Sequence, residues 1–118
     1  MGDVVDINQK KFFTLDEARA LLPIVKRITA SAEEDIKALS LQHGHATTSQ
    51  RKVEIEERVK NRFHDWCQKL QKLGCETKGM WLVDFDNGEG YFCWNHPEPE
   101  LDHFHGYDGG FKGRVKIH

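Results

Sequence analysis

Residues 13–28, FTLDEARALLPIVKRI, contain the start of a long amphipathic helix. Thr14 and Glu17 have the spacing of a capping box, in which each side chain accepts a hydrogen bond from the other residue's backbone amide. From Ala18 to Leu39, apolar residues recur every three or four positions, which predicts one helix that ends at about residue 42. Because Pro23 lies inside this pattern, the sequence also predicts a kink or a local break near residues 19–23.

A second amphipathic helix follows a polar break, QHGHATTSQ, at residues 42–50. Thr48 or Ser49 is suited to cap this helix, and Gly74 is suited to end it. Its apolar positions again share one face: Ile55, Val59, Phe63, Trp66, Leu70 and Leu73. Two helices of similar length with a short connection should pack antiparallel, so the sequence predicts a helical hairpin over residues 13–74.

The pattern changes from helix to strand after Gly79. MWLVDF (80–85) and YFCWN (91–95) are rich in aromatic and β-branched residues, and DNGEG between them is typical of a turn. These stretches predict a β-hairpin with Trp81, Val83 and Phe85 on one face, and RVKIH (114–118) suggests a final short strand. We therefore expect an α+β fold, with a long antiparallel helical hairpin and a small antiparallel β-unit at one end.

The length of 118 residues predicts one domain, 1–118. We expect a flexible, polar lead-in at residues 1–12, the helical hairpin at 13–74, and a β-hairpin with a motif-bearing tail at 79–118. Seventeen basic and nineteen acidic residues give a net charge of -2, which argues against nucleic-acid binding. No apolar run is long enough for a membrane span or a signal peptide. Without an export signal, three cysteines indicate reduced thiols and not a set of disulfides, so we expect a cytoplasmic protein.

Three stretches carry a resemblance to a known family: FTLDEARALLPIVKRI, KGMWLVDFDNGEGYFCW (78–94) and EPELDHFHGYDGGFKGR (98–114). Together they resemble the small prokaryotic family named domain of unknown function 2203, which implies a bacterial protein. This sequence has Phe104 where the family has tryptophan and Pro97 where it has glycine. The family has no established activity, so the resemblance implies motif positions and leaves the function open. Those positions are Asp84, Cys93, Trp94, Glu98, His105, Phe111, Gly113 and Arg114.

The tail suggests two kinds of site. Imidazole and thiolate ligands suit zinc, and the candidate metal ligands are Cys93, His96, His103 and His105. Their spacing matches no well-known zinc motif, so we expect no cofactor and keep zinc as the alternative. The second candidate is a ligand-binding cluster of Asp84, Glu98, His105 and Arg114, in which an arginine could clamp a small anion. The alternative for this cluster is an ion network that holds the tail against the sheet.

The helices predict self-association. A β-unit of fewer than 40 residues cannot cover two long apolar stripes, and a second hairpin from another copy would do so. We therefore expect a dimer or a higher even oligomer. Whether the protein is an enzyme stays open. The leading interpretation is a non-enzymatic assembly or interaction module; the alternative is a small-anion or metal-binding protein, catalytic or not, with a site centred on His105.

Overall fold

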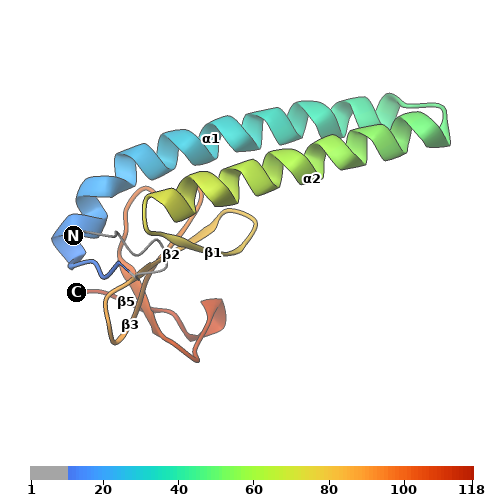
Figure 1. Cartoon of the computed structure of the whole chain (residues 1–118). Coiled ribbons are helices and arrows are strands. Elements are labelled where there is room, and N and C mark those ends of the chain that lie inside the picture. The colour runs from blue at the N-terminus through green and yellow to red at the C-terminus, as the bar shows by residue number, and fades with distance from the viewer. Residues whose placement is uncertain (1–10) are drawn as a thin grey trace, which may run out of the picture.

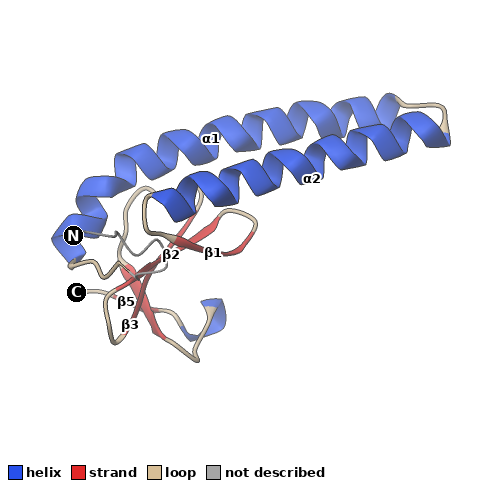
Figure 2. Ribbon diagram, in the orientation of Figure 1, coloured by secondary structure: helices blue, strands red, loops and turns tan. Residues whose placement is uncertain are grey.

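The computed structural model describes residues 11–118 as two long helices and a five-stranded antiparallel sheet, which confirms the predicted α+β fold. Residues 1–10 of the predicted lead-in (1–12) lie outside the described residues. The sheet lies against one end of the helical hairpin, and the loop end of the hairpin extends well beyond it (Figures 1 and 2). No helix among the described residues combines the length and the apolar character that a membrane crossing needs.

Helix α1 (Leu15–His45) begins at the predicted capping box. The Thr14 hydroxyl accepts a hydrogen bond from the Glu17 amide at 3.1 Å, and the Glu17 carboxylate accepts one from the Thr14 amide at 2.8 Å. The helix continues through Pro23 without a break, although its first turns bend away from the axis of the rest (Figure 1). Pro23 and Arg19 lie on the exposed side, so water can solvate the carbonyl that the proline leaves without a donor.

Helix α2 (Ser49–Lys72) is capped by Thr48 and is followed by Gly74 in the left-handed region, with φ at 92°. It returns antiparallel along α1, as predicted. The two helices share a buried hydrogen bond, in which the Trp66 indole donates to the Thr29 hydroxyl at 2.9 Å. This bond explains why a threonine occupies a fully buried helical position, because its hydroxyl has a partner there.

The sheet is a meander in which every strand pairs with the next one along the chain. Its strands are β1 (Glu76–Gly79), β2 (Leu82–Asp86), β3 (Gly90–Asn95), β4 (His103–Gly106) and β5 (Val115–Lys116). The predicted hairpin is β2 and β3, and the predicted last strand is β5. Strands β1 and β4 were not predicted. Strand β1, ETKG, has no apolar residue that could alternate with polar ones, and β4, HFHG, has a single apolar residue, too few to establish an alternation.

One expectation about the first predicted strand is wrong. Trp81 does not belong to that strand; it lies in the turn between β1 and β2, with φ at 66°. Its ring still joins the core, edge-on to Trp66 with centroids 5.0 Å apart. Val83 and Phe85 are fully buried and pack in one cluster with residues of both helices.

The segment before α1 also joins the sheet. The Phe13 amide donates a hydrogen bond to the Asp86 carbonyl at 2.7 Å, and the Phe13 ring meets the Phe85 ring edge-on at 5.4 Å. On the other side of the core, the Arg19 side chain donates to the Leu101 carbonyl at 3.1 Å, and Lys26 donates to the Pro99 carbonyl. These contacts fix the end of the hairpin on the β-unit.

Candidate functional site

The sheet buries polar side chains on the face that points away from the helices. Successive residues of a strand alternate between the two faces, so the neighbours of Val83 and Phe85 point outward from the core. The strand register brings Asp84 opposite Cys93, and Tyr91 opposite His105. Each of these residues is less than a tenth exposed, and so is a further acid on β2: Asp84, Asp86, Tyr91, Cys93 and His105.

A shared proton links Asp84 to His105. The His105 Nδ1 atom lies 2.8 Å from the Gly106 carbonyl oxygen, which can only accept, so Nδ1 carries a proton. The other ring nitrogen, Nε2, lies 3.1 Å from Asp84 Oδ1. One proton must therefore lie between Nε2 and the carboxylate, in an ion pair or in a neutral pair. Either way, both ring nitrogens are engaged, and neither is free to act as a base toward Cys93.

The surroundings keep the cluster in its uncharged or paired forms. Burial raises the pKa of Asp84 above its ordinary value, although the hydrogen bond from His105 acts in the opposite direction. Burial, and next the neighbouring Asp84 carboxylate, raise the pKa of the Cys93 thiol to about 12. At neutral pH Cys93 is therefore a thiol, and without a free base beside it the cluster lacks an activated cysteine nucleophile.

Glu98 and Arg114 form a second pair at the edge of this cluster. The guanidinium donates two parallel hydrogen bonds to the carboxylate, at 2.9 Å from Nη1 and 2.8 Å from Nη2. The carboxylate also accepts a bond from the Asn95 amide at 2.8 Å. Burial acts to raise the pKa of Glu98, but the bonds from Arg114 and Asn95 outweigh it, so that pKa lies below its ordinary value. A bidentate pair of this geometry is strong and directional.

The tail closes over the outer face of the sheet. The Tyr107 hydroxyl donates to Asp86 Oδ1 at 2.7 Å, and its ring meets the Tyr91 ring edge-on at 5.1 Å. Arg114 lies beside the Cys93 thiol while it holds Glu98. Tyr107 and Arg114 stand at the two ends of an exposed loop, and their side chains contact the cluster from this side of the sheet.

The structure distributes the predicted site residues over three places. The ligand-binding candidates form two pairs, Asp84 with His105 and Glu98 with Arg114, on either side of Cys93. Of the metal candidates, Cys93 and His105 lie together, and Asp84 completes their group. His96 lies elsewhere and contacts Glu33 of α1 at 3.2 Å. His103 is the strand partner of Cys93 but lies outside the group of Asp84, Cys93 and His105, and its Nδ1 atom is 2.9 Å from Asp102 and 3.7 Å from Glu98.

Sequence reasoning missed the contributions of Asp86 and Tyr107. A signal for Asp86 was present, because in LVDFD (82–86) the acids Asp84 and Asp86 alternate with apolar residues. Once the DNGEG turn fixes the hairpin register, Asp84 and Asp86 must share a face with Cys93 and Tyr91. Tyr107 carried no such signal, because its contact depends on the path of an irregular loop.

The fold and the cluster define an α+β domain in which a helical hairpin covers one face of a five-stranded meander and a glycine-rich tail covers a polar cluster on the other. A model of the family described as an uncharacterized conserved protein, domain of unknown function 2203, matches residues 11–117, and the chain belongs to this family. Comparison with curated proteins and with solved structures gave no match.

Replacing Arg114 with alanine is expected to lower the free energy of unfolding by about 2 kcal/mol, the size of a charge-assisted hydrogen-bonded pair whose partner is left behind. Thermal and urea unfolding measure the change. Lys112→Ala, in the exposed turn of the same loop, is the control and should change stability by less than about 0.5 kcal/mol. Because both terminal nitrogens of Arg114 are engaged by Glu98, phosphate and small carboxylates should not stabilise the wild type. Stabilisation by such an anion, lost in Arg114→Ala, would contradict this expectation.

Proposed function

We propose that the protein is a non-enzymatic assembly module, in which the helical hairpin pairs with the hairpin of a second copy to form a four-helix arrangement. The observation that carries this proposal is the apolar groove on the sheet side of the hairpin, beyond the turn between β1 and β2. The groove has a cavity of about 470 Å³ and is lined by the apolar residues Val59, Phe63 and Met80 and by the polar residues Ser40, His43, Glu56 and Lys60. We call it the hairpin groove.

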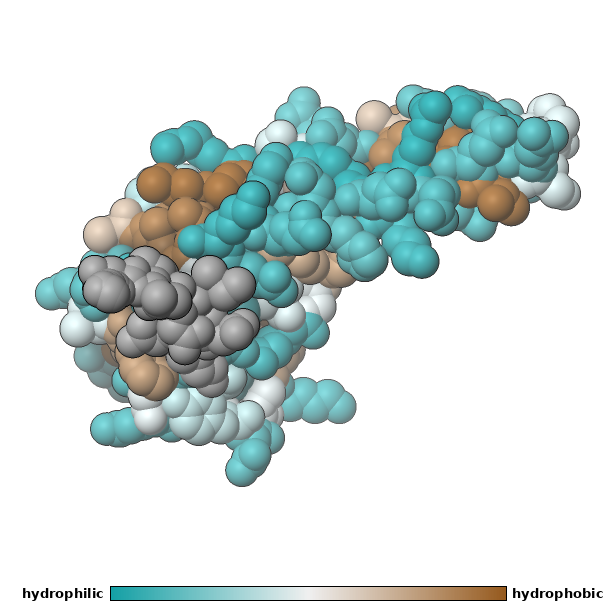
Figure 3. Space-filling model, in the orientation of Figure 1, coloured by the Kyte–Doolittle hydropathy of each residue, from teal (hydrophilic) through white to brown (hydrophobic). Residues whose placement is uncertain are grey.

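The sheet does not reach far enough to fill the hairpin groove. The part of the hairpin nearest its loop lies beyond the strands (Figure 2), and hydrophobic surface shows on this part between charged residues (Figure 3). Met80, at the tip of the β1–β2 turn, is half exposed. Two helices alone cannot enclose a core, because each apolar stripe is wider than one neighbouring helix covers.

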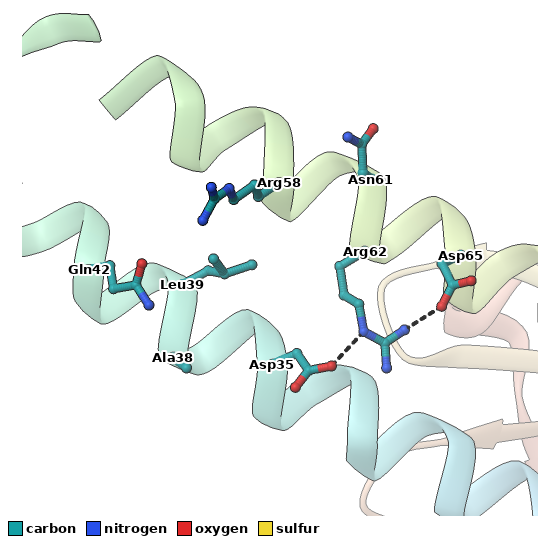
Figure 4. A pocket seen from close by; sticks show the side chains of 8 residues that line it. All are labelled: Asp35, Ala38, Leu39, Gln42, Arg58, Asn61, Arg62 and Asp65. Atoms are coloured by element: carbon teal, nitrogen blue, oxygen red, sulfur yellow. Dashed lines mark hydrogen bonds and ion pairs between the residues drawn. The ribbon is translucent and has the colours of Figure 1, made fainter. Parts of the chain in front are cut away.

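A second pocket of the hairpin, with a cavity of about 540 Å³, carries charged residues among those that line it. There Arg62 bonds to Asp35 of α1 at 2.7 Å and to Asp65 of its own helix at 2.8 Å, as Figure 4 shows. At 100° per residue, Arg62 lies about 60° from Val59 and about 100° from Phe63 around α2, whereas Asn61 lies about 160° from Val59. The charged positions of α2 therefore adjoin the apolar positions Val59 and Phe63, and Asn61 lies on the far side of the helix from Val59.

The charges at the groove favour a second copy over an unrelated partner. Glu56 and Lys60 stand one turn apart on α2 and flank Val59. In a two-fold pairing of antiparallel α2 helices, with the axis level with Arg58, each Glu56 lies level with the Lys60 of the other copy. The pairing is self-complementary, and the two Val59 side chains are then offset by only about 3 Å along the helices, at 1.5 Å per residue.

The chemistry of the polar cluster also supports a role without catalysis. The Cys93 thiol is protonated and the ring of His105 has no free nitrogen, so nothing there is prepared to attack a substrate. The three cysteines are free, as a reducing compartment requires, and the proposal places the protein in the bacterial cytoplasm.

The test of the proposal is the mass of the protein in solution. Light scattering and sedimentation at micromolar concentration should report a dimer or a higher even oligomer. Val59→Asp should shift it to the monomer, because an unpaired charge in an apolar contact is costly. Asn61→Asp, on the far side of α2 from Val59, is the matched control and should leave the mass unchanged.

A charge exchange tests the orientation of the pairing. Lys60→Glu should weaken the dimer by placing like charges opposite each other, and the double variant Glu56→Lys, Lys60→Glu should restore it. A wild type that is monomeric at tens of micromolar protein, or an oligomer indifferent to Val59→Asp, would overturn the proposal.

A further inference from the structure

Three different metal-ligand types meet inside the polar cluster. Asp84, Cys93 and His105 each offer one ligand atom, and these atoms all lie within 4.8 Å of one another. Asp84 Oδ1 and His105 Nε2 are 3.1 Å apart. In a tetrahedral zinc site with bonds of about 2.0–2.3 Å, neighbouring ligand atoms are about 3.5 Å apart. Small side-chain rotations would therefore bring the three atoms onto one ion.

One atom of this group has no partner. Asp84 is 1% exposed, and its second carboxylate oxygen, Oδ2, has no hydrogen-bond partner among the described residues. A buried carboxylate oxygen without a donor is costly, and such atoms in folded proteins generally contact a water or an ion. His105 and the weakly donating Cys93 thiol are neighbours of the carboxylate, and Oδ2 still has bonding capacity left for a cation.

The histidine is oriented as metal-binding histidines are. The ring donates Nδ1–H to a backbone carbonyl, that of Gly106, and thereby directs Nε2 toward Asp84 and Cys93. A metal-bound imidazole almost always donates its other nitrogen in this way, because that bond fixes the tautomer and the ring plane. The hydrogen bond that would orient His105 as a metal ligand is therefore already present within β4.

We propose that Asp84, Cys93 and His105 bind one divalent transition-metal ion of the zinc class, under the loop that Tyr107 and Arg114 hold in place. Nitrogen, sulfur and oxygen ligands together suit Zn²⁺, whereas Ca²⁺ and Mg²⁺ require oxygen alone. The bound carboxylate and thiolate balance the charge of the ion. Arg114 does not repel it, because Glu98 neutralises the guanidinium. Three protein ligands leave the fourth tetrahedral position to a water.

The site goes beyond the proposed assembly function and does not depend on it, because the hairpin groove and the cluster share no residue. Binding requires two protons to pass to the solvent as the bonds to the metal form, that of the Cys93 thiol and the one between His105 Nε2 and Asp84, with no change in oxidation state. Since strands β2, β3 and β4 each contribute one ligand, the ion would tie the three strands together on their outer face.

The experiment uses the full chain, stripped with a chelator and titrated with Co²⁺ as a spectroscopic probe and with Zn²⁺. We expect one Co²⁺ per chain, with a thiolate-to-cobalt charge-transfer band in the near ultraviolet and intense visible bands of tetrahedral coordination. One equivalent of Zn²⁺ should remove these bands and raise the melting temperature.

Variants separate the site from adventitious binding by other histidines. Cys93→Ser should fold, as judged by circular dichroism, and should lose the charge-transfer band. Asp84→Asn and His105→Gln should each weaken binding at least tenfold. Cys67→Ser removes a thiol outside the group and is the matched control, which should keep the band. A wild type without the band, or a band that survives Cys93→Ser, would overturn the inference, whatever the oligomeric state proves to be.

Discussion

Replacing Trp66 with alanine is expected to lower the free energy of unfolding by about 3–5 kcal/mol, the range for removing a fully buried large aromatic side chain. Trp66 is completely buried and stands where the two helices meet the sheet. Its ring lies 5.0 Å from that of Trp81 and 5.5 Å from that of Phe63, measured between centroids. Its removal would leave a cavity with no nearby flexible segment to fill it. Urea unfolding followed by far-ultraviolet circular dichroism measures the change.

Trp66→Phe separates the packing of the ring from its hydrogen bond. This variant keeps most of the apolar volume but leaves the buried Thr29 hydroxyl without its indole donor. A loss of about 1–3 kcal/mol is expected. Adding Thr29→Val should recover part of that loss, because the unpaired hydroxyl is then gone as well. If Trp66→Ala cost no more than an exposed substitution, the position of Trp66 at the centre of the core would be contradicted.

The second large effect is expected at Gly90, where β3 and β4 approach most closely. A Cβ at this position would lie 2.5 Å from the Phe104 ring and 2.6 Å from the His105 carbonyl oxygen. The carbonyl belongs to the backbone of β4, so relief requires the two strands to separate. Gly90→Ala should therefore cost about 3 kcal/mol or more, at the upper end of the overpacking range. It should also move His105 away from Asp84.

The sheet provides a matched control for this prediction. Gly106 is the direct partner of Gly90 across β3 and β4, but a Cβ there would meet nothing within 4 Å. Gly106→Ala should change stability by less than about 0.5 kcal/mol. Thermal melts of the two variants, measured side by side, give the comparison. Equal effects of the two alanines would show that the close approach at Gly90 does not exist in solution.

Local signals in the sequence were sufficient for the main elements of the fold. The capping box at Thr14 predicted the first residue of α1, because that motif satisfies backbone amides within four residues. The DNGEG turn predicted the β2–β3 hairpin for the same reason, since the turn depends on its own residues. Helix α1 runs three residues further than the expected residue 42, because Gly44 remains helical within the last turn.

The features that were missed depend on contacts between distant segments. Strand β4 is HFHG, and nothing in those four residues identifies a strand until β3 lies beside it. Trp81 was assigned to a strand because aromatic residues favour strands, yet the turn between β1 and β2 needs its backbone in the left-handed region. Of the kink or local break expected near residues 19–23, the break is absent, because α1 is continuous through Pro23, while its first turns bend away from the axis of the rest (Figure 1).

The sequence identified most residues of the candidate site, but it did not show which of them lie together. Asp84 and Cys93 were each singled out, but in separate sets, and their pairing follows only from the register of β2 and β3. His105 joins them through β4, which the sequence did not indicate. His96 and His103 were grouped with Cys93 because they are near it in sequence. The structure pairs His103 with Cys93 across β3 and β4, although the His103 ring contacts Asp102, whereas His96 lies away from Cys93 and contacts Glu33 of α1.

The bond between the Phe13 amide and the Asp86 carbonyl has a consequence for the order in which the protein folds. During synthesis both helices leave the ribosome before any strand, and they can pair through contacts that are local in the chain. Phe13 reaches its place only after residues 85 and 86 have been made, so the first turn of α1 is held by a segment synthesised much later. The growing chain therefore gains structure first in the helices. It gains structure last at the edge strand β5, next to which Arg114 pairs with Glu98.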